Sequence, residues 1–173
     1  MGDNLPVRDV SALFAAAEAA GRVGTARKTK PVDARLAHGG EVVITHISDD
    51  GKETQSKPAD IGDWVVRNRC PETGNETYLV KADMFGERYK GPFSEPDGEG
   101  WYEFQPEGPE MRFFKITEAD GPFVFTAPWG EEMIARVGDA IVRDPEKPKD
   151  TYRVAAAAFK CTYNIIASPG AQK

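Results

Sequence analysis

Residues 59–67 read ADIGDWVVR, and residues 135–143 read ARVGDAIVR. Each stretch is followed by a second shared block, TYLVKADMFGERY at 77–89 and TYRVAAAAFKCTY at 151–163. Eleven of the twenty-two aligned positions are identical, which unrelated segments seldom achieve. The sequence therefore predicts an internal duplication, in which one folding unit occurs twice. The shared positions that we expect to be structural are Gly62, Asp63, Tyr78, Phe85 and Tyr89 in the first copy, and Gly138, Asp139, Tyr152, Phe159 and Tyr163 in the second.

The first shared block is typical of a turn that leads into a strand. Glycine permits the positive φ that a tight turn can require, and the aspartate beside it can accept hydrogen bonds from nearby backbone N–H groups. In the strand, a period of two puts Asp63, Val65 and Arg67 on one face. Asp63 and Arg67 cannot pair, because about 13 Å separates their Cα atoms. Arg67, like Arg143, must therefore find a carboxylate on a neighbouring strand, a carbonyl group or a ligand.

The second shared block changes its period. Thr-Tyr-x-Val alternates like a strand, whereas Ala82, Phe85 and Tyr89 are spaced three and four residues apart, as in a helix. This pattern predicts a strand and then a short helix that closes each module with aromatic core residues. Stacking of these aromatic rings on a ligand is the alternative. Nine residues separate the two blocks in the first copy and seven in the second, which predicts hairpin loops at 68–76 and 144–150.

The N-terminal part predicts a helix over residues 9–20, with Asp9 or Ser11 as its N-cap and Gly21 as its end. Its apolar stripe docks either on its own module or on a partner. The basic segment 22–35 is interpreted as a connector or edge strand, with an anion-contacting arm as the alternative. Next, the β-branched stretch EVVITHIS at 41–48 and the Asp50-Gly51 pair predict a hairpin.

The predicted fold is α+β and mainly antiparallel β, with two small β-rich modules preceded by a helix. Residues 91–110 are dense in Gly, Pro and acids, which predicts a linker between the modules, although its stretch WYEF at 101–104 either packs on a module or forms a short edge strand. The predicted division is a helix and connector at 1–26, a first module at 27–90, the linker at 91–110, a second module at 111–164 and a tail at 165–173.

The ordered set of motifs resembles the PGDYG family of bacterial and phage proteins. The matching stretches are KTKPVDARLA from Lys28, IGDWVVRN from Ile61 and TYLVKADMFGERY from Thr77. Ile61 and Val137 stand where the family name has Pro, and Trp64 and Ala140 stand where it has Tyr. The resemblance implies a fold for residues 27–89, repeated in part over 113–163. It implies no catalytic residues.

Charge and composition argue against several classes of function. The net charge of −6 and the sequence pI near 5.1 disfavour non-specific binding to nucleic acid or to anionic membranes. The longest apolar run, VAAAAF at 154–159, is far shorter than the roughly 20 residues that span a bilayer. The N-terminus lacks the basic region of a secretory signal. We therefore expect a soluble intracellular protein, either cytoplasmic or, if the chain is a mature form, associated with an organelle or an assembly.

Recognisable catalytic and cofactor motifs are absent from the sequence. The two histidines and the two cysteines show no metal-ligand spacing, so we expect no metal, although a single disulfide between Cys70 and Cys161 is an open alternative. No nucleophile elbow and no phosphate-binding glycine loop occurs, so we expect no cofactor. The sequence therefore favours a protein that is not an enzyme.

Two functions remain. The first is a protein-interaction or accessory subunit whose exposed apolar patch includes Leu13 and Phe14 or Trp101. The second is a module that binds a small anionic ligand, such as a nucleotide, through arginine and lysine beside tryptophan. The candidate residues for that ligand are Arg67, Arg143, Lys28, Lys30, Trp64 and Trp129.

Overall fold

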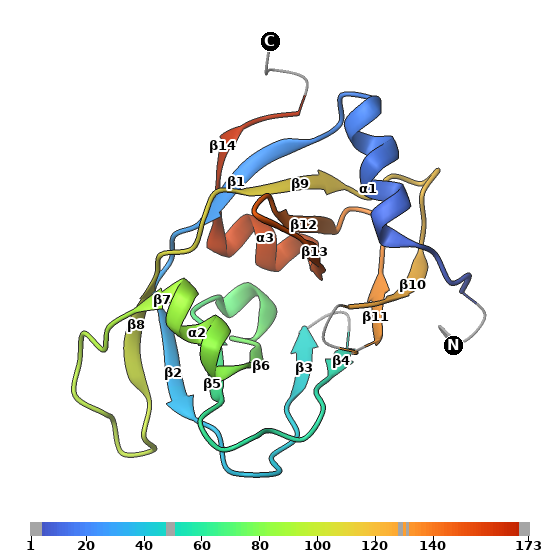
Figure 1. Cartoon of the computed structure of the whole chain (residues 1–173). Coiled ribbons are helices and arrows are strands. Elements are labelled where there is room, and N and C mark those ends of the chain that lie inside the picture. The colour runs from blue at the N-terminus through green and yellow to red at the C-terminus, as the bar shows by residue number, and fades with distance from the viewer. Residues whose placement is uncertain (1–4, 48–50, 128–129, 131, 170–173) are drawn as a thin grey trace. The chain divides into compact units, whose positions relative to one another are not determined.

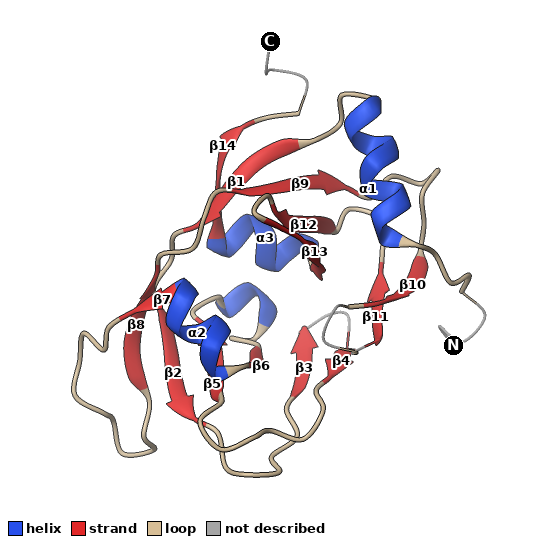
Figure 2. Cartoon of the chain, in the orientation of Figure 1, coloured by secondary structure: helices blue, strands red, loops and turns tan. Residues whose placement is uncertain are grey.

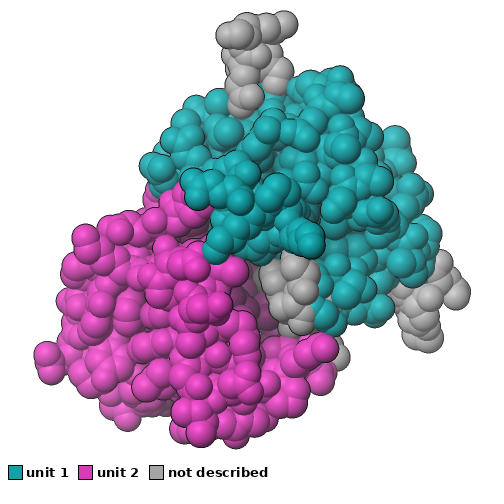
Figure 3. All heavy atoms as spheres, viewed as in Figure 1, with its two compact units in different colours: residues 1–27, 110–173 teal, residues 28–109 magenta. Residues whose placement is uncertain are grey.

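The computed structural model describes residues 5–47, 51–127, 130 and 132–169. Their three α-helices and their mostly antiparallel strands confirm the predicted α+β fold (Figures 1 and 2). The chain divides into two compact units (Figure 3). Unit 1 comprises residues 1–27 and 110–173, and unit 2 comprises residues 28–109.

Unit 2 is built on a five-stranded antiparallel sheet with the order β6-β5-β2-β8-β7. A hairpin of β3 and β4 and the helix α2 complete the unit. Its elements are β2 (Val32–Leu36), β3 (Ile44–Ile47), β4 (Gly51–Gln55), β5 (Trp64–Asn68), the 3-10 turn η2 (Pro71–Thr73), β6 (Thr77–Val80), α2 (Ala82–Arg88), β7 (Tyr89–Lys90) and β8 (Tyr102–Pro106).

Unit 1 is built on a second five-stranded sheet with the order β13-β12-β9-β1-β14. A hairpin of β10 and β11 and the helices α1 and α3 complete the unit. Its elements are α1 (Val10–Ala19), β1 (Gly24–Lys28), β9 (Met111–Lys115), β10 (Phe123–Thr126), β11 (Glu132–Ala135), β12 (Ala140–Asp144), β13 (Lys147–Val154), α3 (Ala156–Thr162) and β14 (Tyr163–Ala167).

The two sheets have the same arrangement, strand for strand. β5 corresponds to β12, and their registers agree: Val66 lies opposite Ala34 and Tyr78, and Val142 lies opposite Phe113 and Tyr152. The chain can be divided between β7 and β8 into two halves, each of which ends with the strand after its closing helix. The first strand of each half then pairs with a strand of the other half, because β1 pairs with β9 and β8 pairs with β2. Each unit therefore takes one strand from the other half of the chain.

This division differs from the predicted boundaries. Residues 102–106 form β8 inside the sheet of unit 2 rather than part of a linker, because Phe104 alternates with polar neighbours and its side chain is buried in that sheet's core. Residues 163–167 form β14, so the predicted tail from residue 165 begins inside a strand. The predicted loop at 144–150 is shorter, since β12 and β13 extend into it from both ends.

Helix α1 begins and ends close to where the sequence predicts. Asp9 caps it by accepting hydrogen bonds from Ser11 N and Ala12 N at 3.0 and 3.3 Å, and Gly21 follows it with φ +73°. The helix packs on its own unit, where the Phe14 ring meets the Phe114 ring edge-on at 5.4 Å. Of the two alternatives for its apolar stripe, the structure has the intramolecular one.

Each sheet has an apolar layer beneath its closing helix. In unit 2, Phe85 of α2 packs on Phe104 and Val66, and in unit 1, Phe159 of α3 packs on Phe113 and Val142. The predicted core role of the shared Phe is therefore confirmed in both units. On its other face the sheet of unit 1 is covered by α1 and the β10–β11 hairpin.

We predict that Gly24→Ala destabilises unit 1. A Cβ atom on Gly24 would lie 2.5 Å from the carbonyl oxygen of Ala167 and 2.9 Å from a ring carbon of Phe113, so β14 or the core must move. The expected loss is about 1–3 kcal/mol in the free energy of unfolding, measured by urea denaturation. Gly98→Ala is the control, because a Cβ there meets nothing within 4 Å. Equal stability of both variants would contradict the packing of β14 on β1.

Candidate functional site

The glycine of each shared block has the predicted backbone conformation. Gly62 has φ +100° and Gly138 has φ +95°. Residues other than glycine rarely adopt such φ values, so both turns depend on this residue. A Cβ at either position would meet only one equivalent atom, the Cβ of Ala82 or of Ala156 at 3.8 Å. The backbone conformation, and not a lack of space, therefore requires glycine here.

Asp63 joins three parts of unit 2. One of its carboxylate oxygens, Oδ2, accepts hydrogen bonds from Asp60 N at 2.9 Å and from Lys81 Nζ at 2.8 Å. The other, Oδ1, accepts one from Ala82 N at 3.0 Å, which is the first N–H of α2. The carboxylate is almost fully buried. It therefore fixes the turn, the strand β5 and the start of α2 together.

Asp139 does the same in unit 1. It accepts hydrogen bonds from Arg136 N at 2.8 Å and from Ala156 N at 3.0 Å, the first N–H of α3. Its cation is Arg153, whose Nε and Nη2 each lie 2.7 Å from Oδ2. Lys81 and Arg153 do not occupy aligned positions in the shared blocks. Each of the two carboxylates therefore has a cationic partner, and the two cations come from positions that do not align.

The charge of Asp63 is stabilised despite its burial. Burial raises the pKa of the Asp63 carboxyl, but the Lys81 ammonium and the N–H groups of Asp60 and Ala82 outweigh it and hold the pKa below its ordinary value. The carboxylates of Asp60 and Asp63 in turn raise the pKa of Lys81. Both groups are therefore charged at neutral pH, as an ion pair needs.

We predict that Asp139→Asn costs more stability than Asp63→Asn. The Arg153 side chain, which pairs with the Asp139 carboxylate, is 0% exposed, whereas Lys81 is 48% exposed and can turn to water. We expect a loss of about 3–5 kcal/mol for Asp139→Asn and about 1–2 kcal/mol for Asp63→Asn in urea denaturation. The reverse order would show that burial of the cation does not set the cost.

Arg67 has a carboxylate partner on a neighbouring strand, one of the three alternatives that the sequence left open. Its Nη2 lies 3.3 Å from Asp33 Oδ2 on β2. The guanidinium also stacks on the Trp101 ring, 4.1 Å from the ring centre, while Arg35 approaches the same ring at 5.2 Å. Trp101 is buried in unit 2. Arg67 is therefore held by its own unit rather than directed into a pocket.

Arg143 makes the equivalent contacts in unit 1. Its Nε donates to Thr151 Oγ1 at 3.0 Å, and its guanidinium stacks on the Phe14 ring at 4.2 Å. Burial lowers the pKa of Arg143. Phe14 and Trp101, which cover these two arginines, lie in the cores of their units, and Leu13 packs against the same core as Phe14. The expectation that these three residues form an exposed apolar patch is therefore wrong.

Trp64 and Lys28 do not converge with either arginine in the part of the chain that the structure describes. Trp64 points to the opposite face of the sheet, stacked on Phe85 at 4.4 Å, as a period of two requires. Lys28 Nζ contacts the Tyr78 hydroxyl and lies 3.2 Å from the Tyr89 hydroxyl. Lys30 is partly buried. Trp129 lies outside the described residues.

A hydrogen bond between tyrosines recurs in both units. The hydroxyl groups of Tyr78 and Tyr89 are 2.9 Å apart, and those of Tyr152 and Tyr163 are 3.4 Å apart. Sequence reasoning placed these rings in the core and did not predict the polar pair. The identical spacing of the two tyrosines in both blocks was the available signal. Lys28 joins the pair in unit 2.

Glu41 forms a bidentate ion pair with Arg35 on unit 2. The guanidinium nitrogens lie 3.1 and 2.6 Å from the two carboxylate oxygens, and His38 N donates to Oε1 at 3.0 Å. The hydrogen bonds from Arg35, opposed by burial and aided by that N–H, lower the pKa of Glu41 to about 2. This ion pair stabilises the folded state above the unfolded pKa and is lost as the pH falls toward 2.

We predict that Glu41→Gln lowers the stability of unit 2 by about 2 kcal/mol at pH 7, a value that allows for partial exposure of the pair. The loss should shrink below about pH 4 and vanish as the pH falls below about 2, because the wild-type carboxyl is then protonated too. Urea denaturation at several pH values measures this. Glu95→Gln, at an exposed loop position, should show no such dependence. A loss independent of pH would contradict the ion pair.

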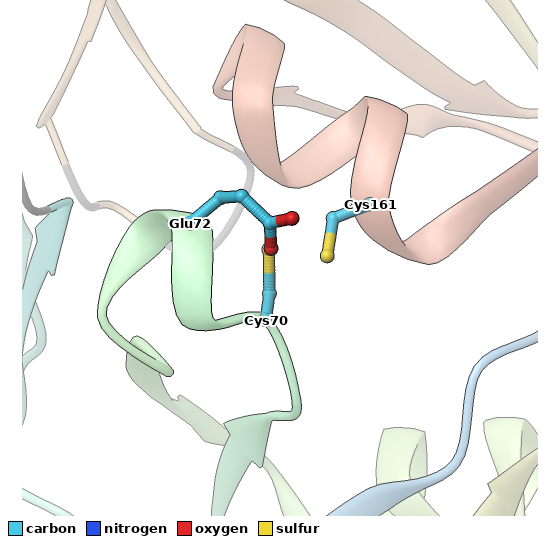
Figure 4. A group of neighbouring side chains, drawn as sticks. All are labelled: Cys70, Glu72 and Cys161. Carbon is cyan, nitrogen blue, oxygen red and sulfur yellow. The ribbon is translucent and has the colours of Figure 1, made fainter.

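The two cysteines lie in different local settings. Cys70 is buried just before η2, and its Sγ lies 3.7 Å from Oε1 of Glu72 (Figure 4). Cys161 lies on α3, one residue before the end of that helix (Figure 4).

The loop after β5 is held by internal polar bonds. Thr73 Oγ1 donates to one carboxylate oxygen of Glu76, and the other oxygen accepts from Asn68 Nδ2 at 2.8 Å.

Three of the four edge strands of the five-stranded sheets carry features that discourage pairing with another chain. β7 is two residues long and is followed by Gly91-Pro92. The carbonyl of Thr77 on β6 accepts a hydrogen bond from Thr45 Oγ1 of the β3–β4 hairpin at 2.7 Å. β13 begins with the exposed run Lys147-Pro148-Lys149.

The fourth edge strand, β14, differs from the other three. Its five residues, Tyr163–Ala167, include no charge and no proline. Ile165 and Ile166 are 44% and 46% exposed. Figure 1 shows β14 at the end of the sheet of unit 1, next to β1. Sequence reasoning missed this strand, although two adjacent β-branched residues were a signal for it.

Searches against protein-family models, curated proteins and solved structures find no match. The resemblance to the PGDYG family therefore stays a prediction. None of the described helices has both the length and the apolar character needed to cross a membrane.

Proposed function

We propose that the protein is an interaction or accessory subunit, built from a tandem-duplicated module, that binds a protein partner through the β14 edge. The single observation that carries the proposal is this uncharged edge strand with two exposed isoleucines, beside three edges that carry protective features. Strand edges of this kind bind other strands through backbone hydrogen bonds.

The matching architecture of the two units supports the duplication. Strand order and register agree, and the Gly-Asp turn, the capped helix and the stacked arginine occur in both units. The shared aspartate, arginine and tyrosine residues make hydrogen bonds or ring contacts inside their own unit. The shared residues therefore account for a folding unit, and a binding surface has to be sought where the two units differ.

The alternative, a small anionic ligand bound by arginine and tryptophan, has less support. Arg67 and Arg143 stack on Trp101 and Phe14, and Arg67 also faces Asp33. A phosphate or carboxylate at Arg67 would compete with that carboxylate. Trp64 lies on the other face of the sheet from Arg67, so the two cannot grip one ligand.

We predict that partner binding is lost when the β14 edge becomes charged. The test is affinity purification with mass spectrometry, comparing the wild-type chain with the double variant Ile165→Lys/Ile166→Lys. Charges on both faces of the strand should prevent an apolar strand from adding to it. The control is Ile61→Lys, at an isoleucine 91% exposed on unit 2, which should retain the partner. The proposal fails if no protein, including a second copy, depends on the edge.

A further inference from the structure

We propose that the occupant of the β14 edge is β14 of a second copy of this chain, paired antiparallel to it. The inference rests on the proposed function and names its partner. It starts from the open side of β14, where the last strand of the sheet has β1 as its neighbour among the described strands. Pairing would join two five-stranded sheets into one continuous sheet.

The two described residues after β14, Ser168 and Pro169, leave this edge open. Pro169 lies over Gly24 of β1, because its Cδ would be 2.9 Å from a Cβ placed there. The described residues that follow the strand therefore turn back over the sheet instead of covering its outer side. Asn164, Ile165 and Ile166 are all exposed in the structure. The backbone of the strand is accessible to a second strand.

The side chains of β14 favour an apolar, uncharged partner strand. Ile165 and Ile166 are consecutive, so they project from opposite faces of the sheet, and each is nearly half exposed. A partner must therefore offer uncharged side chains on both faces at the same level. A strand with lysine or glutamate at these positions would place a charge beside an isoleucine as water is excluded.

A second β14 meets these requirements. It has the matching length, it has apolar side chains at adjacent positions, and it brings no charge to the contact although the whole chain carries −6. Its twofold symmetry requires a like pair at the centre. With Ile165 opposite Ile165, Ile166 lies opposite Asn164 and Tyr163 opposite Ala167, so all five residues have a partner. The contact occupies the β14 edge of each copy, so assembly through this edge stops at the dimer.

The first experiment measures mass in solution by sedimentation equilibrium over a wide concentration range. The wild-type chain should approach twice 18.9 kDa. Ile165→Lys/Ile166→Lys should raise the dissociation constant at least about tenfold, and Ile61→Lys should leave it unchanged. Circular dichroism shows whether each variant is folded. A wild-type chain that stays monomeric throughout, or a dimer unaffected by the double variant, overturns the proposal.

A second experiment tests the register and does not depend on folding of the lysine variant. Opposite Cβ atoms in an antiparallel pair lie about 4.5–5.5 Å apart, and a small movement of the exposed edge strands brings them within the about 3.5–4.5 Å that a disulfide spans. Ile165→Cys should therefore give a covalent dimer under mild oxidation, and the wild type and Ile61→Cys should not. Equal cross-linking of Ile165→Cys and Ile61→Cys overturns the pairing.

The two proposals can fail separately. A monomeric wild type whose β14 edge captures a different protein in the affinity purification overturns pairing with a second copy and leaves the proposed function standing. A monomer with no partner that depends on the edge overturns both. A dimer that the double variant disrupts supports both.

Discussion

The hydrogen bond from the first N–H of the closing helix to the aspartate after the turn organises each unit. Ala82 N donates to Asp63 and Ala156 N donates to Asp139, both at 3.0 Å. A short helix cannot hold itself in place, because seven residues are too few for stability in water. The buried carboxylate fixes the helix against the sheet, and this position brings its Phe and the following Tyr over the apolar face. The glycine with positive φ is needed because it aims the aspartate at that N–H.

The local features of this arrangement could be predicted from the sequence, but the strands and side chains with which they pair could not. The period of two placed Arg67 on one face of β5 and Trp64 on the other, and Asp9 and Gly21 marked the ends of α1. The pairing of β1 with β9 was not predictable in this way, since the partners Gly24 and Phe113 are far apart in the chain. Periodicity describes one strand at a time and says nothing of its neighbour. The same limit applied to the cations, because Lys81 and Arg153 reach equivalent carboxylates from positions that do not align.

The stacked arginines explain why a shared residue need not mark a binding site. In unit 1 the ring beneath the guanidinium belongs to α1, and in unit 2 it belongs to the segment before β8. These two segments share neither sequence nor secondary structure. Both segments cover a face of a sheet from which an arginine side chain projects. An aromatic ring covers the apolar surface there and also offers its face to a cation, so either segment can satisfy the same arginine.

The exchange of strands between the two halves of the chain also explains why the edge strands β7 and β14 differ. β7 must be short, because the residues after it turn at Gly91-Pro92 and return to form β8, the adjacent strand of the same sheet. The neighbour of β14 is instead β1, which comes from the other half of the sequence. β14 therefore does not have to lead into its neighbour, and it extends for five residues where β7 has two. The same topology that gives the two sheets one arrangement leaves unit 1 with the longer and more apolar edge.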